Sequence, residues 1–436
     1  MSAVVDSPVK PEARPYLDAF HGVAAEPEWL GRFRRQSLDR FARQGFPSRR
    51  SENWRYLDLR ALEKNPLLPV ASSHEGTAAS LAGVTLASPT YRLVFVDACF
   101  SPALSGVTGG HGLPEGVWLG SMKAAIAERP ELVQAGLEDA DQPFAALNAA
   151  FFADGFVLDV APGMVVDKPI EIVHLTSAGG SLHTRNLVNL GAGSRATILE
   201  TFSGKTRYWR NDFAAWRLGD GASLTRIALI EEGHEAMHLG EVAATLGAGA
   251  KLDGFALLLG GGTVRREASV TLAGDHAECR IDGAFLVSGS EEANIVTTID
   301  HASVGGKTSE LIKGVAAGHG HGAFQGKIIV REGAQQTDAR QTSRNLILGR
   351  RAVIDTKPEL EILADDVKCA HGASVGDLDE AALFYLRARG IPLEEARRLL
   401  VEGFLREPIE GIADPAIREH LLSRLTERLG RLEDER

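Results

Sequence analysis

The side chains best suited to chemistry in this chain are Cys369 and His371, which stand two positions apart in the run DDVKCAHG. On an extended strand that spacing places both side chains on one face. A thiolate and an imidazole are ligands suited to iron, zinc and copper, and Glu361, Asp365 and Asp366 add carboxylate oxygens nearby in the sequence. We take Cys369 and His371 as the candidate metal-ligating pair. The plainer alternative is a half-buried cysteine and a turn histidine.

A second candidate metal site is the run HEAMH, which matches the H-E-x-x-H pattern at His234, Glu235 and His238. That pattern binds zinc when a helix brings both histidines onto one face. This copy lies in a glycine-rich, strand-like region, so we expect it not to bind zinc and keep a zinc hydrolase only as an alternative. His319 and His321 lie between glycines and are interpreted as turn residues.

Two Gly-Lys-Thr triplets resemble the end of a P-loop. A P-loop also requires a glycine five residues before the first glycine of the triplet, so that backbone amides surround the phosphates. Leu199 precedes the triplet at Gly204, and His301 precedes the one at Gly306. We therefore predict that this chain does not hydrolyse ATP.

The charge balance of the chain disfavours several classes of partner. Its 436 residues carry a formal net charge of −11, whereas nucleic-acid binding depends on basic patches. No apolar run approaches the roughly 20 residues that span a bilayer, and the opening MSAVVDSPVK lacks the features of a signal peptide. We expect neither a nucleic-acid partner nor a membrane.

The number of cysteines limits which disulfides and iron–sulfur clusters this chain can form. Cys99, Cys279 and Cys369 are the three cysteines, too few for a disulfide framework, so a reducing cytoplasm is the expected location. Three thiols are also too few for one chain to hold a four-cysteine iron–sulfur cluster. Any such cluster needs a partner or non-cysteine ligands.

The elements that must position these residues follow an internal repeat. Similar units of an apolar residue, a glycine-bearing turn and a strand-like run begin at Leu190, Leu218, Leu246 and Leu272, which are 28, 28 and 26 residues apart. Near-constant spacing of such units is typical of a solenoid, in which each coil buries its apolar face against its neighbours. We predict a mainly β chain with a β-helix core over residues 156–376.

Helical segments flank this core. We predict a mostly helical N-terminal domain over residues 1–155, with a linker near 71–88, and a helical C-terminal domain over 377–436. The short C-terminal helices must pack on the solenoid or on another protein. Their apolar positions are Leu383, Leu386, Leu399, Leu400 and Phe404.

Two stretches of the sequence resemble a known family. The run 335–376, followed by LDEAALFYLRARGIP, and the earlier run SENWRYLDL are similar to motifs of the SufB/SufD family of iron–sulfur cluster assembly scaffolds. The scarcity of cysteine favours the SufD branch of that family. The resemblance implies a right-handed parallel β-helix flanked by helical domains, which agrees with the expectation from the repeat.

The resemblance also implies a function. It implies a non-enzymatic scaffold that acts with a SufB-like paralogue and a SufC-like ABC-type ATPase, the latter binding residues 378–408. His371 matches the functional histidine of the family, which would deliver or hold iron where the two β-helices meet, while the role of Cys369 is less defined. The isolated chain would bind no cofactor stably, and iron or a nascent cluster would be transient in the complex.

Three alternatives stay open at this point. One is the zinc hydrolase at His234, Glu235 and His238. Another is a polysaccharide-acting β-helix enzyme that uses carboxylates clustered on one solenoid face. A third is SufB-like function, or a homodimer that acts as a scaffold alone. Neither the complex stoichiometry nor binding of a flavin by the complex follows from the sequence.

Overall fold

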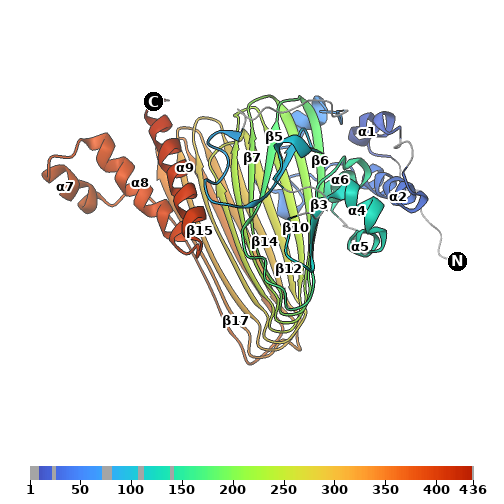
Figure 1. Ribbon diagram of the computed structural model, residues 1–436. Helices are drawn as coiled ribbons and strands as arrows, with labels where there is room; N and C mark the ends of the chain where they lie inside the picture. Colours follow the sequence, from blue (N-terminus) through green and yellow to red (C-terminus); the bar gives the residue numbers. More distant parts are fainter. Residues whose placement is uncertain (1–8, 22–25, 71–80, 107–111, 138–141, 435–436) are drawn as a thin grey trace.

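The computed structural model describes residues 9–21, 26–70, 81–106, 112–137 and 142–434. Its centre is a two-sheet parallel β-solenoid, with helices at both ends (Figure 1). From β4 onwards the chain alternates between the two sheets, so that two strands and their turns make one coil. The predicted β-helix core with flanking helices is confirmed.

The first sheet, sheet A, contains nine strands. In order along the sheet these are β3 (Val117–Ser121), β4 (Phe156–Val160), β6 (Gly180–Leu190), β8 (Tyr208–Leu218), β10 (Met237–Leu246), β12 (Thr263–Leu272), β14 (Glu292–His301), β16 (His321–Val330) and β18 (Val353–Ile362).

The second sheet, sheet B, contains ten strands. In order along the sheet these are β2 (Cys99–Phe100), β1 (Tyr91–Val96), β5 (Ile170–Thr176), β7 (Arg195–Gly204), β9 (Ser223–Glu232), β11 (Lys251–Leu258), β13 (Glu278–Val287), β15 (Lys307–Ala317), β17 (Asp338–Leu348) and β19 (Lys368–Gly376).

Both sheets begin before residue 156, where the core was expected to start. β1 pairs in parallel with β5, and β3 pairs antiparallel with β4. The segment that precedes the repeat therefore supplies the first strands of both sheets.

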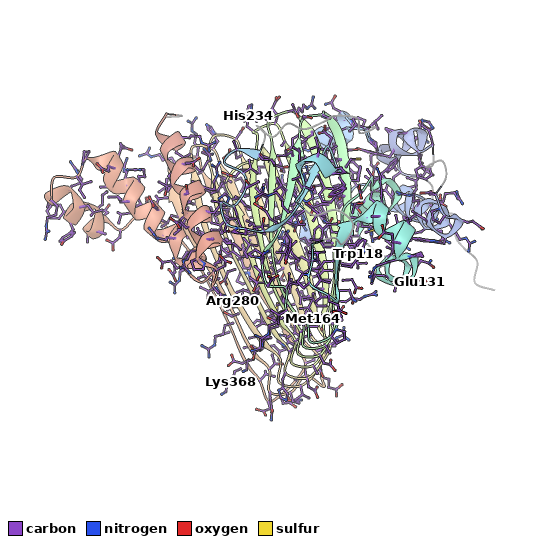
Figure 2. All side chains as sticks on the ribbon, viewed as in Figure 1. Trp118, Glu131, Met164, His234, Arg280 and Lys368 are labelled. Carbon is purple, nitrogen blue, oxygen red and sulfur yellow. The ribbon has the colours of Figure 1, made fainter. Side chains whose placement is uncertain are left out.

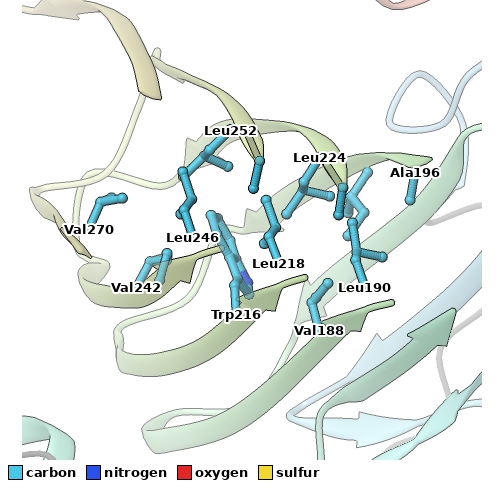
Figure 3. Close-up of a cluster of buried hydrophobic side chains, with 14 of the residues drawn as sticks. Val188, Leu190, Ala196, Trp216, Leu218, Leu224, Val242, Leu246, Leu252 and Val270 are labelled. Atoms are coloured by element: carbon cyan, nitrogen blue, oxygen red, sulfur yellow. The ribbon is translucent and has the colours of Figure 1, made fainter. Parts of the chain in front are cut away.

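The sequence repeat corresponds to strand register. Leu190 is paired with Leu218, Leu218 with Leu246, and Leu246 with Leu272. All four side chains are at most 3% exposed and belong to one apolar core, in which Figure 3 shows Leu190, Leu218 and Leu246. Stacking equivalent residues on neighbouring coils buries apolar surface that no single coil can bury alone.

The turns after these leucines explain the repeated glycines. Gly193, Gly221 and Gly249 have φ values of +68°, +65° and +62°, a left-handed region in which a side chain is strained. The amide of each donates to a carbonyl of the next coil, for example from Gly193 to Asp220. His276 adopts φ +59° at the equivalent turn of the next unit, so the conformation persists where the glycine does not.

Helices of the N-terminal region cover the outer face of sheet A, on the right in Figure 1. The α-helices are α1 (Arg14–Ala19), α2 (Glu28–Gln44), α3 (Arg60–Lys64), α4 (Met122–Glu128), α5 (Pro130–Gly136) and α6 (Pro143–Phe151), and short 3₁₀ helices are η1 (Pro11–Ala13), η2 (Glu52–Trp54) and η4 (Pro102–Leu104). Residues 71–80 of the predicted linker lie outside the described residues.

The run SENWRYLDL lies across sheet A and reaches its last strand. Trp54 is buried beneath Arg265 of β12, whose guanidinium carbon lies 4.0 Å from the indole centroid. The carbonyl of Asn53 accepts from Gln325 of β16 at 3.1 Å, and Glu52 pairs with Lys357 of β18 at 2.5 Å. This segment therefore ties the N-terminal region to the C-terminal end of the solenoid.

The C-terminal region contains α7 (Glu380–Ala388), α8 (Leu393–Glu410) and α9 (Pro415–Asp434). Leu405 of α8 and Leu421 of α9 pack with Leu257 of β11 and Val315 of β15 on the outer face of sheet B. In contrast, α7 extends away from the solenoid (Figure 1) and has no buried residue. None of the helices in the described residues is long and apolar enough to cross a membrane.

Candidate functional site

Cys369 and His371 lie on β19, the last strand of sheet B. β19 pairs with β17 on one side only, and β18 forms the corresponding edge of sheet A. His371 is exposed and Cys369 is half-buried. The predicted pair therefore lies at the open end of the solenoid, where backbone donors and acceptors of both edge strands are available.

The two side chains share the inward face of β19. Cys369 is paired with Ala339 and packs against the apolar core between the sheets. Because alternate residues of a strand point to the same side, His371 faces the same interior. Burial raises the pKa of the Cys369 thiol, so Cys369 is less readily ionised than a fully solvated cysteine.

Behind His371 lies a polar interior that the sequence did not reveal. His371 is paired with Gln341 of β17, which is paired with Glu310 of β15. Nε2 of Gln341 donates to Oε2 of Glu310 at 2.6 Å, and the two side chains are 1% and 2% exposed. Burial raises the pKa of Glu310 to about 7, because a desolvated carboxylate is unfavourable.

The carboxylates near the pair in sequence are placed elsewhere. Glu361 of β18 pairs with Lys327 at 2.6 Å, while Asp365 and Asp366 lie in the turn before β19. Among the described residues, no three His, Cys, Asp or Glu side chains converge as a preformed metal site. The chain itself therefore offers two ligands, not a closed coordination sphere.

The HEAMH run does not form a zinc site. His234 and Glu235 are exposed on the turn between β9 and β10, with His234 at the upper rim in Figure 2, whereas His238 is buried inside the solenoid. The run is not a helix, so the two histidines share no face. The geometry contradicts the zinc-hydrolase alternative.

His238 instead belongs to a buried ion cluster. Its Nδ1 lies 2.8 Å from Glu232 and its Nε2 lies 2.5 Å from Asp212. Burial alone would lower the pKa of His238, but the two carboxylates outweigh this effect and raise it. Both ring nitrogens are engaged, which leaves no lone pair for a metal.

The other histidine motif is also structural. His319 is exposed in the turn before β16, and Nε2 of His321 lies 2.8 Å from Asp355 of β18. The interpretation of these histidines as turn residues agrees with the position of His319. His321 instead begins a strand and links β16 to β18.

The outer face of sheet B carries a groove of about 470 Å³ that includes three carboxylates. Glu278 lies 2.9 Å from Lys251, Asp253 lies 3.7 Å from Arg280, and Asp338 lies 3.4 Å from Arg340. A glycoside hydrolase requires two carboxylates that face each other across a sugar. Carboxylates paired with cations do not provide that arrangement, which counts against the polysaccharide alternative.

The C-terminal helices divide the predicted apolar positions into two groups. Leu383, Leu386 and Leu400 are half-buried and Leu399 is 39% exposed, so this group is accessible. Phe404 packs on the solenoid instead, because its ring lies 4.2 Å from Nζ of Lys313.

The most exposed apolar residues of the C-terminal region were not among the predicted positions. Phe384 and Tyr385 of α7 are 75% and 56% exposed. Periodicity missed them because it selects the helix face that packs on this chain.

Comparison with known proteins identifies the family. Residues 173–404 match the family model described as "SUF system FeS cluster assembly, SufBD core domain", and residues 85–172 match the "SufBD protein N-terminal region". This chain belongs to the SufBD family. The predicted resemblance is confirmed, and most of the solenoid lies within the stretch that matches the SufBD core.

Relatives of the SufBD family align over most of this chain. "Iron-sulfur cluster assembly protein SufD" of Escherichia coli is 31% identical and covers 90% of this chain and 92% of that protein. SufD of Bacillus subtilis is 27% identical, and the alignment covers 94% of this chain and 96% of that protein. "Protein ABCI7, chloroplastic" of Arabidopsis thaliana is 29% identical, and the alignment covers 89% of this chain and 84% of that protein. The SufD branch predicted from the cysteine count is thereby supported.

Proposed function

We propose that this chain is a non-enzymatic scaffold subunit for iron–sulfur cluster assembly, in which His371 holds iron at the open end of the solenoid. The observation that carries this proposal is the position of His371, on the inward face of the last, exposed strand. Iron is cargo in this proposal. Cys369 on the same face is a second candidate ligand.

The open end is suited to a partner of the same architecture. The last strands of both sheets, β18 and β19, have a free edge, and most of β19 is exposed. A second parallel solenoid would cover both edges together, because its own end presents two strands at matching separation. A SufB-like paralogue fits this requirement and would also carry sulfur to the junction.

The donor set supports a shared site. One imidazole and one thiol are too few to complete the coordination of iron. A neutral imidazole at neutral pH can bind iron directly, and the ligands missing from this chain would come from the paralogue. Iron would therefore be held transiently and only where the two chains meet.

The ATPase partner would bind the C-terminal helices. This chain lacks a P-loop pattern at both Gly-Lys-Thr triplets, so movement driven by ATP must come from another subunit. The side chains of Phe384, Tyr385 and Leu399 are apolar and exposed, and together with the half-buried Leu383, Leu386 and Leu400 they would make up one docking surface on α7 and α8. We assign this surface to a SufC-like ABC ATPase in the cytoplasm.

The experiment that tests the scaffold assignment is co-expression of the tagged chain with a SufB-like and a SufC-like subunit, followed by purification and native mass determination. We expect one complex that contains all three subunits. A lone monomer or homodimer, with both partners soluble, would overturn the assignment.

The role of His371 is tested within that complex by comparing His371→Ala with His319→Ala, a matched change of an exposed turn histidine. We expect His371→Ala to leave the complex assembled and to lower its iron and cluster content. Equal iron content in the two variants would remove His371 from the mechanism.

A further inference from the structure

A row of polar side chains extends inward from His371 between the two sheets. His371, Gln341 and Glu310 occupy equivalent positions on three successive strands of sheet B. Neighbouring strands lie about 4.8 Å apart, so each side chain can reach the next. The layer beside this row of polar side chains is apolar and includes Ala339 and Ile328.

The amide of Gln341 has a defined orientation. Nε2 donates to Glu310 on β15 at 2.6 Å, so the nitrogen side of the amide faces away from the open end. Oxygen and nitrogen diverge from the planar amide carbon, so Oε1 is not shared with Glu310, and the residue paired with Gln341 on its other side is His371. This Oε1 is buried and has no hydrogen-bond partner among the described residues.

The opposite sheet holds this amide in place. A Cβ at Gly326 of β16 would lie 2.1 Å from Nε2 of Gln341, so the amide lies directly against the backbone of that glycine. Gln341 is 1% exposed and has little freedom to turn. A buried acceptor without a donor destabilises the folded state, and the exposed His371 ring can rotate to supply a donor.

We propose that Gln341 is a positioning residue for His371. Its Oε1 accepts the N–H of the imidazole, which fixes the tautomer and turns the other ring nitrogen, with its lone pair, toward the open end. Metal-binding histidines commonly donate their second nitrogen in this way. This inference rests on the proposed iron-holding role of His371, and Glu310 supports it by fixing the direction of the amide.

The test is nuclear magnetic resonance of the full-length chain labelled with ¹⁵N-histidine. The chemical shifts of the two ring nitrogens report the tautomer. The signal of His371 is identified by its loss in His371→Asn. We expect one tautomer of His371 in the wild-type chain. Gln341→Met, which keeps length but removes the acceptor, is expected to give a tautomer mixture. Gln134→Met, a change of an exposed glutamine on α5, is the matched control and should leave the resonance unchanged.

Binding of ferrous iron to the assembled complex is the second readout. Loss of an orienting partner typically weakens metal binding by about 10–100-fold, and we expect this change for Gln341→Met but not for Gln134→Met. A tautomer mixture already present in the wild-type chain would overturn the inference without any variant, as would an unchanged His371 resonance in Gln341→Met. If the tautomer changes as expected but His371→Ala leaves the iron content unaltered, the positioning stands and the iron role fails.

Discussion

At the scale of single residues, Glu310 is a buried acid in the interior of the solenoid. It is a carboxylic acid with 2% exposure and a pKa raised to about 7 by burial. A raised pKa means that the folded state holds its proton more tightly than the unfolded chain does. The tighter proton binding by Glu310 therefore stabilises the folded state fully below the unfolded pKa of about 4.5. This stabilisation is lost as pH rises through the folded pKa of about 7.

Glu310→Gln should remove this pH-dependent loss. Since one pKa unit corresponds to about 1.4 kcal/mol, we expect the variant to gain on the order of 3 kcal/mol relative to wild type between pH 4.5 and pH 8. The measurement is the difference in unfolding free energy, or in melting temperature, between variant and wild type at each pH. Glu332→Gln, at an exposed turn, is the control and should show no such trend. A pH-independent difference for Glu310→Gln would contradict the buried-acid assignment.

His238 shows how a residue-scale motif depends on its surroundings. The letters of HEAMH match a zinc motif, yet His238 lies between Asp212 and Glu232 inside the solenoid. The same three side chains on a helix would meet a metal, whereas on a turn and a strand they point to different sides. Backbone geometry, not residue type, decides the chemistry available to this run.

At the scale of elements, α7 is the helix whose sequence is not explained by the fold of this chain alone. It buries no residue and extends from the solenoid, while Phe384 and Tyr385 remain exposed. By contrast, α8 and α9 place their apolar faces on sheet B. A helix with this exposure in one subunit is expected to pack in the assembly.

The double change Phe384→Ser and Tyr385→Ser should therefore weaken binding of the ATPase subunit. Aromatic side chains at an interface centre often contribute 2 kcal/mol or more, so we expect affinity to fall at least about tenfold without a change in melting temperature. Titration calorimetry with the purified ATPase measures the first, and thermal unfolding the second. Val165→Ser, a change of another exposed apolar residue, is the control. If the double variant and Val165→Ser bind the ATPase with equal affinity, α7 is excluded from the interface.

At the scale of the whole molecule, the two ends of the solenoid differ. One end begins with the antiparallel strands β2 and β3, and the other ends on the parallel strands β18 and β19, whose outer edges are free. In Figure 2 Lys368, the first residue of β19, lies at the lower tip, far from the N-terminal helices. Natural solenoids cover such edges, because unpaired strand edges recruit other strands.

Hydrogen exchange should report this asymmetry. In the isolated chain we expect the backbone amides of β18 and β19 to exchange faster than those of β10 and β12, which have neighbours on both sides. Addition of the SufB-like paralogue should slow exchange in β18 and β19 and leave β10 unaffected, as followed by mass spectrometry. Unchanged exchange at β18 and β19 within a complex that has demonstrably formed would mean that the partner docks elsewhere.

The sequence by itself determined the architecture and the position of the candidate site. Four leucines at near-constant spacing predicted the solenoid because each one must stack on the next coil, and the register pairs them in that order. Spacing also placed Cys369 and His371 on one face, since alternation along a strand is local geometry. The resemblance of the flanking motifs was sufficient to assign the family, because those motifs are local runs of sequence.

Only the tertiary structure decided which distant residues act together. Parallel register brings Gln341 and Glu310 behind His371, although some 30 residues separate each from the next. It likewise encloses His238 between Asp212 and Glu232, and it leaves Phe384 exposed while Phe404 is packed. Such contacts depend on coil length and on which face a helix buries, and these are properties of the packed chain that no local pattern encodes.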